Sequence, residues 1–172
     1  MLNWAYFPRS AKPTSLALDV VKAFQSAHSS FTSDKHTLKS NDVLAQVAPF
    51  LTTLGFRVET GKKHDQKVHV PVLYGNNGKV AKSFLADAHH PECHFVVEIE
   101  AGRGVINNQF LKDLFQACLM DEVEYLAIAV RNVYVAAKIK NADFDNVLKF
   151  FDTLYASRRL TLPLKGILIL GY

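Results

Sequence analysis

The feature that most constrains this chain is a pair of acids inside an apolar strand, FVVEIE at 95–100. Side chains of a strand alternate between two faces, so Glu98 and Glu100 share one face. The apolar segment before this strand ends in Asp87, and a turn near Pro91 would fold the two segments into a hairpin. Diagonal neighbours across a hairpin reach one another, and three carboxylates on one face repel unless a cation or a shared proton compensates. The pattern favours a metal site.

A second interpretation of the same acids stays open. Alternation alone would place Glu98 and Glu100 on the wet face of a half-exposed antiparallel strand. Glu59, at the end of a short predicted strand over 56–60, is a candidate fourth acid of the site. Acids near strand ends are commonly solvated, and this is the ordinary expectation for Glu59.

Length and composition predict a single domain. The 172 residues suffice for one buried core, and we expect one domain over 1–172, with a core at about 38–137 and the terminal elements packed on it. The net charge of +4 permits a polyanionic partner. Two cysteines give no disulfide framework, and no apolar run is long enough for a membrane span. We therefore expect a soluble, cytoplasmic protein.

Hydrophobic periodicity predicts alternating helices and strands. Residues 1–12 read as an irregular arm, Thr14 or Ser15 as the cap of a first helix, and Ser40 as the cap of a second one that Pro49 kinks or breaks. A three-strand meander is expected over 67–73, 79–87 and 95–100, with a turn at 75–78. A helix after Asn107 or Asn108, an interior parallel strand over 125–130, an amphipathic helix around 144–154 and a last apolar strand near 166–170 follow.

This order predicts an α/β fold of three layers, α/β/α, with a central mixed β-sheet. Together with Asp87 at the end of one strand and Glu98-Ile99-Glu100 in the next, it resembles the PD-(D/E)XK nuclease superfamily, whose fold is restriction-endonuclease-like. The resemblance covers about 40–132. Two positions depart from the motif: Ala86 stands where the family name has proline, and Glu100 stands at the lysine position. Some restriction endonucleases of the superfamily carry glutamate there.

The resemblance implies hydrolysis of phosphodiester bonds with Mg²⁺, for which Mn²⁺ would substitute. Carried over to this sequence, Asp87 and Glu98 would be metal ligands and the backbone carbonyl of Ile99 a third. Glu100 would orient the attacking water, bind a second ion or accept a proton, and Glu59 would be an additional catalytic acid.

Several other polar residues are candidates for supporting roles. Lys62, Lys63 or Lys82 would replace the missing lysine, although strict alternation sends Lys82 to the face opposite Asp87. Arg103 is suited to clamp a phosphate, because guanidinium binds phosphate oxygens bidentately. Polar residues of the helix after the motif are expected on a solvated helix face: Gln109, Asp113 and Gln116.

Three classes of function remain on the sequence alone. The first is a metal-dependent DNA endonuclease of restriction or defence type, with RNA as an alternative substrate. The second is a catalytically inactive nuclease-fold module that binds nucleic acid or a protein partner, which glutamate at position 100 favours. The third is an unrelated α/β protein. With one active site per chain, cleavage of both strands would need a homodimer or two encounters.

Overall fold

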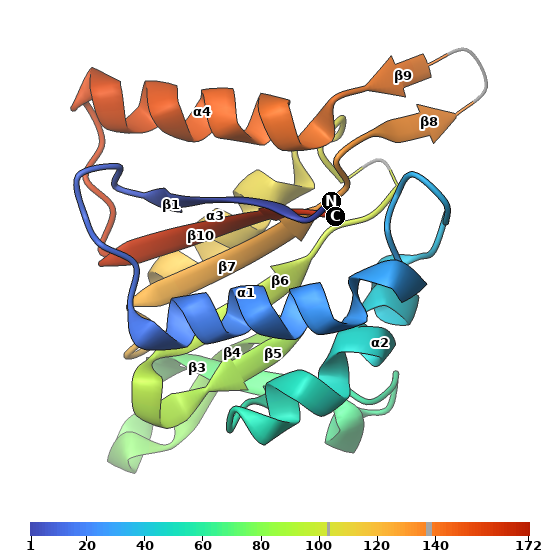
Figure 1. Ribbon diagram of the computed structural model, residues 1–172. Helices are drawn as coiled ribbons and strands as arrows, with labels where there is room; N and C mark the ends of the chain where they lie inside the picture. The colour runs from blue at the N-terminus through green and yellow to red at the C-terminus, as the bar shows by residue number, and fades with distance from the viewer. Residues whose placement is uncertain (103, 137–138) are drawn as a thin grey trace.

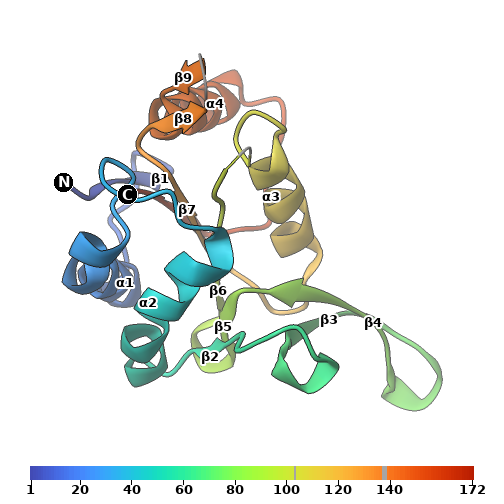
Figure 2. The same ribbon diagram turned by 90° about the vertical axis from the view of Figure 1, so that its right-hand side faces the viewer.

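The computed structural model describes residues 1–102, 104–136 and 139–172, in which one mixed sheet lies between two layers of helices (Figures 1 and 2). The helices are α1 (Ser15–Ala27), α2 (Ser40–Thr53), α3 (Gln109–Leu119) and α4 (Asp143–Ser157). The central sheet has the order β1 (Asn3–Phe7), β10 (Gly166–Gly171), β7 (Tyr125–Val130), β6 (Phe95–Ile99), β5 (Ala88–His90) and β2 (Arg57–Val58). The predicted three-layer α/β/α architecture is confirmed.

Strand β6 lies inside the sheet, parallel to β7 and antiparallel to β5. Its side chains alternate as predicted. Val97 and Ile99 enter the hydrophobic cluster under α1 and α2, whereas Val96 enters the cluster under α3 and α4. Glu98 therefore shares the face of α3, inside the protein. Because both faces of β6 are covered, the alternative of a half-exposed strand with Glu98 in water is wrong.

Helix α2 runs without a break through Pro49, so the predicted break is wrong. Lys39, not Ser40, is the cap residue. The helix is followed by Gly55, whose φ of +97° is readily adopted only by glycine. The Gly55 and Phe56 amides donate to the carbonyls of Thr52 and Leu51, which satisfies the last turn of the helix.

The N-terminal residues form a strand rather than the predicted irregular arm. β1 pairs antiparallel with β10, and β10 pairs parallel with β7. β1 and β10 lie outside the core expected at about 38–137, where terminal elements were expected to pack on that core. They are instead strands of the central sheet itself. The arm was misread because a short edge strand such as NWAYF has little periodicity of its own.

The predicted three-strand meander is also wrong. β3 (Val68–Tyr74) and β4 (Val80–Ala86) form a hairpin that is a separate two-stranded sheet, joined by the expected turn at Asn77 and Gly78, both with positive φ. The antiparallel partner of β6 is the short strand β5, which begins directly after Asp87. The chain therefore passes from the hairpin to the central sheet at Asp87.

A second hairpin, β8 (Tyr134–Ala136) with β9 (Ile139–Asn141), follows the interior strand β7. It was not predicted, since its strands have only three residues each. Among the described residues, no helix combines the length and the apolar character that a membrane span requires.

Candidate functional site

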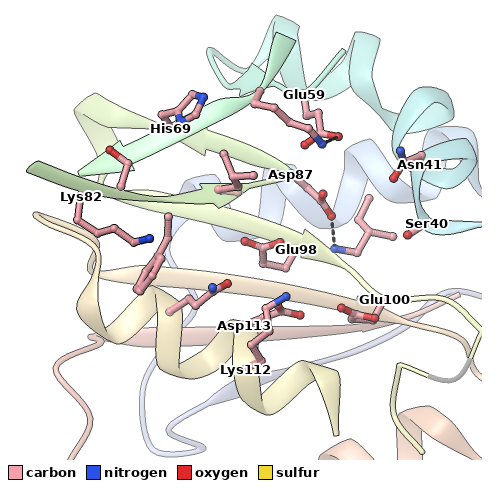
Figure 3. A pocket seen from close by; sticks show the side chains of 17 residues that line it. Ser40, Asn41, Glu59, His69, Lys82, Asp87, Glu98, Glu100, Lys112 and Asp113 are labelled. Carbon is pink, nitrogen blue, oxygen red and sulfur yellow. Dashed lines mark hydrogen bonds and ion pairs between the residues drawn. The ribbon is translucent and has the colours of Figure 1, made fainter. Parts of the chain in front are cut away.

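A cavity of about 590 Å³ opens where β6 leaves the sheet, between the β3–β4 hairpin, the start of α2 and helix α3 (Figure 3). Five carboxylates line it, Glu59 among them, and the other four lie around one shared space: Asp87, Glu98, Glu100 and Asp113. Three of them are the acids singled out in the sequence. The structure thus brings together residues from β6, from the β4–β5 junction and from α3.

Asp87 is fixed on both sides by backbone hydrogen bonds. Its Oδ2 accepts from the N–H of Ile99 at 2.8 Å, and its carbonyl accepts from the N–H of Glu59 at 2.8 Å. Burial raises the pKa of Asp87 to about 6, against the lowering effect of the Ile99 amide, and the neighbouring Glu59 and Asp113 raise it further. The pairing of Ala88 with Val97, when continued, brings Asp87 opposite Glu98.

Glu98, the acid of β6, is buried, with 8% of its surface exposed. Burial, and then the charges of Asp87 and Asp113, raise its pKa well above the ordinary range. A carboxylate in this position is stable as an anion only next to compensating positive charge.

Glu100 follows the last residue of β6, and its N–H continues the parallel ladder by donating to the carbonyl of Ala129 at 2.8 Å. Burial and then the adjoining carboxyl of Asp113 raise the pKa of Glu100 to about 8. Asp113 is itself only 3% exposed, its pKa is raised by burial, and its Oδ2 is buried without a hydrogen-bond partner. The unsatisfied oxygen points to a missing donor or cation at this place.

Glu59 lines the same cavity, and its side chain is only 8% exposed. The ordinary expectation of a solvated acid is therefore wrong. Its Oε1 accepts from Nζ of Lys67 at 2.5 Å, and the positive charge of Lys67 lowers the pKa of Asp87. Lys67, which precedes β3, is a half-buried lysine on the wall of the acidic cavity that the sequence reading missed.

The lysines considered from the sequence are placed differently. Lys82 lines the cavity, contrary to strict alternation, because Asp87 lies beyond the end of β4 and the hairpin carries bulges. Lys62 and Lys63 are exposed and are not among the residues that line it. Arg103 lies outside the described residues. Lys112 of α3 also borders the cavity, with its Nζ 3.7 Å from Oδ1 of Asp113.

Asp113 was misassigned to a solvated helix face because the phase of α3 was misread. The buried side is formed by Phe110, Asp113, Leu114 and Ala117, whereas the large apolar Phe115 is 58% exposed. The spacing of 110, 114 and 117 is itself a helical stripe that includes position 113. The sequence therefore held the signal, although the larger Phe115 and Cys118 obscured it.

The donor set of the cavity suits a hard cation. All four acids offer oxygen ligands, which Mg²⁺ and Mn²⁺ prefer. Over 1–102, 104–136 and 139–172, no three His, Cys, Asp or Glu side chains already converge closely enough to hold an ion alone. Mg²⁺ ordinarily uses one or two carboxylates, with waters and substrate phosphates completing its shell. The residues thus fit an ion shared with a phosphate-bearing ligand.

No protein-family model matches this sequence, and no curated protein sequence matches it. A solved structure does: the crystal structure of the restriction endonuclease BglII complexed with a DNA 16-mer, with a TM-score of 0.50 and 10% identity over 99% of this chain and 75% of that chain. The chain has a restriction-endonuclease-like fold. At this identity the likeness concerns the path of the backbone, and the DNA is a property of the BglII structure.

Proposed function

We propose that this protein is a metal-dependent DNA endonuclease of restriction or defence type, a PD-(D/E)XK variant with Glu100 in the lysine position. One observation carries the proposal: Asp87, Glu98 and Glu100 meet the buried Asp113 in one cavity. Four acids held together at this cost are typical of a site that binds cations and phosphate. The restriction-endonuclease-like fold supports the same conclusion.

Asp87 and Glu98 would hold the divalent ion, Mg²⁺ with Mn²⁺ as a substitute, and the carbonyl of Ile99 would be a third ligand. When bound, the ion would polarise the scissile phosphate and lower the pKa of the attacking water. Asp87 is oriented for this task by the Ile99 amide. Glu59 holds the backbone of Asp87 and positions Lys67, rather than contacting the reacting atoms.

With the charge of a bound ion compensating the cavity, Glu100 would be ionised and would orient the attacking water by accepting a hydrogen bond from it. The water oxygen forms the new bond to phosphorus and its proton passes to Glu100. The bond from phosphorus to the leaving oxygen breaks, and that oxygen takes a proton from solvent. Lys67, on the wall of the cavity, contributes positive charge beside Glu59. This charge would stand in for the lysine of the family motif, which position 100 lacks.

A second function has a specific observation in its favour. Glutamate in the lysine position adds negative charge where the phosphate would lie, which suits a nuclease-fold module that has lost hydrolysis and binds nucleic acid or a protein. Cleavage separates the two functions, because only the first predicts strand scission.

The test is cleavage of supercoiled plasmid DNA, and of an RNA transcript, over titrations of Mg²⁺ and Mn²⁺. We expect metal-dependent nicking of the plasmid by the wild type and none by the Asp87→Asn variant. Sedimentation with and without duplex DNA tests the proposed homodimer. Binding without cleavage at any metal concentration would replace the endonuclease by the inactive module.

A further inference from the structure

The positive charge of this chain is concentrated in one region, residues 57–86, which we call the basic hairpin region. It contains six Lys or Arg residues and two Asp or Glu residues, a net charge of +4. The whole chain also has a net charge of +4, so the remaining residues balance fourteen basic against fourteen acidic side chains. The uneven distribution gives this one region the electrostatic character of a polyanion-binding surface.

The β3–β4 hairpin projects from the body of the protein, whereas β2, the first strand of the basic hairpin region, lies in the central sheet. Strands β3 and β4 share no ladder with the central sheet, and Figure 2 shows them extending away from it beyond the end of α3. The half of the hairpin nearest the sheet borders the acidic cavity through His69, Lys82 and Ser83. The hairpin therefore extends from the cavity that holds the four acids to the surface of the protein.

The hairpin is anchored to the body along β3, while Lys79 and Lys82 remain in water. Val70 is fully buried against the body, and the Asp121 amide donates to the carbonyl of Pro71 at 2.8 Å. The hydroxyl of Tyr74 also donates to Asp121. Lys79 and Lys82 are exposed, with Nζ of Lys82 5.9 Å from the ring centre of Phe84 on the cavity side. A rigid ribbon with exposed cations loses little entropy when it binds.

We infer that the basic hairpin region binds the sugar–phosphate backbone of duplex DNA next to the phosphate held in the acidic cavity. This inference rests on the proposed function and adds the surface that holds the substrate. A seven-residue strand spans roughly 23 Å at about 3.3 Å per residue, which matches roughly seven base pairs at about 3.4 Å each. A two-stranded ribbon is also one of the elements that the major groove admits.

The acidic cavity gives a further reason to assign phosphate binding to the hairpin lysines. The acids repel phosphate without a metal, so affinity must come from cations outside the cavity. Lys82 lies at its edge and Lys79 near the tip of the hairpin. These two lysines are therefore placed to contact successive phosphates of one strand, at increasing distance from the cavity.

The experiment measures binding of a fluorescent 20-base-pair duplex in EDTA, which prevents cleavage, from 50 to 300 mM salt. The test protein is Lys79→Gln/Lys82→Gln. Its matched control is Lys12→Gln/Lys149→Gln, which removes the same charge from exposed lysines before α1 and on α4. If each hairpin lysine contacts one phosphate, the slope of log affinity against log salt falls by about 1.8, and affinity falls ~10–100-fold. The control keeps the wild-type slope.

The outcomes separate this inference from the proposed function. Equal slopes for the hairpin variant and its control, with wild-type binding intact, overturn the hairpin inference and leave the endonuclease standing. A wild type that neither binds nor cleaves DNA removes the proposed function itself. Tighter competition by single-stranded DNA, RNA or polyglutamate than by unlabelled duplex overturns the assignment of the partner. Equal melting temperatures of the variants confirm that all of them are folded.

Discussion

The backbone N–H of Ile99 donates a hydrogen bond of 2.8 Å to Oδ2 of Asp87. The strand that carries Glu98 and Glu100 thus also orients the acid contributed by the β4–β5 junction. This contact joins two segments that the sequence motif relates only through a gap of variable length. It explains why Asp87 has a defined direction although it lies beyond the last residue of β4.

Replacement of Asp87 by asparagine tests the metal site. The amide oxygen of Asn still accepts from Ile99, while one buried negative charge disappears. We expect the metal-free Asp87→Asn variant to melt at the wild-type temperature or slightly above it, since repulsion with Glu98 and Glu59 is relieved. Thermal melts with Mg²⁺ or Mn²⁺ should stabilise the wild type and leave the variant unchanged. Asp145→Asn, at an exposed position of α4, is the control, and an equal metal response of all three proteins would contradict the assignment.

The acidic cavity predicts that stability falls as the pH rises. A carboxyl whose folded pKa lies above its unfolded value holds its proton more tightly in the native state, so stability is lost as pH rises through that interval. The interval runs from 4.5 to about 8 for Glu100. His89 acts oppositely at lower pH, because burial lowers its pKa from 6.5 to about 4. Above pH 6.5 the contribution of His89 no longer changes, and the loss of stability comes from the cavity carboxyls with raised pKa values, Glu98 and Glu100.

We expect the metal-free protein to lose on the order of 1 kcal/mol of unfolding free energy between pH 6.5 and 8.5, after allowance for solvent screening. Urea denaturation at both pH values in EDTA measures the difference. Glu100→Gln should remove the part of this dependence that Glu100 contributes, and saturating Mg²⁺, which compensates the charges of all the acids, should remove most of it. A wild type whose stability is flat or rises over this range would show that the acids are not held protonated.

Gly104 lies against the carboxyl group of Glu100. A Cβ at this position would overlap Oε2, Cβ and Cδ of Glu100, so Gly104→Ala should displace that side chain. Misplacement of a catalytic group by about 1 Å can cost on the order of 10²-fold in rate. We expect cleavage to fall by this order while metal-dependent stabilisation through Asp87 and Glu98 persists. Asp145→Asn, at an exposed position of α4 outside the cavity and the hairpin, should leave both unchanged.

The sequence predicted β6 well because the two signals that identify it, the alternation of side chains and the flanking turns, both act locally. Alternation placed Val97 and Ile99 on one face and the glutamates on the other, and the flanking turns fixed the ends of the strand. The helix α1 and its cap Thr14 followed from spacing in the same way. The four acids of the cavity needed a further step, because Asp113 joins them only through the packing of α3 on the sheet.

The predictions that were wrong, or that were not made, also have physical causes in contacts between distant parts of the chain. β1 exists because β10 offers it a partner from the far end of the chain, and such pairing leaves almost no local trace. Lys82 reaches the cavity because the chain changes sheets at Asp87, so counting alternation across that junction is not valid. Lys67 was overlooked because its importance depends on Glu59, which the sequence placed in water.

Glu100 decides the mechanism. Glu100→Gln keeps the shape and hydrogen bonding of the side chain but removes its charge. If Glu100 orients the water and takes its proton, cleavage should fall by ~10²–10⁴, while the metal response through Asp87 and Glu98 largely survives. Plasmid cleavage and metal-dependent melts on the same preparation measure both effects.

Glu100→Lys, which introduces the lysine of the PD-(D/E)XK motif, separates the two roles of this acid. The new ammonium would lie beside the buried Asp113, whose Oδ2 lacks a partner, and would bring a cation near the attacked phosphate. We expect the metal-free variant to be more stable than the wild type and to retain measurable cleavage at lower Mn²⁺ concentration. If Glu100 instead holds a second ion, the lysine expels that ion and cleavage is lost at every metal concentration, although the variant is folded and binds DNA. Persistence of cleavage therefore supports the water-orienting role, and its complete loss replaces that role with metal binding.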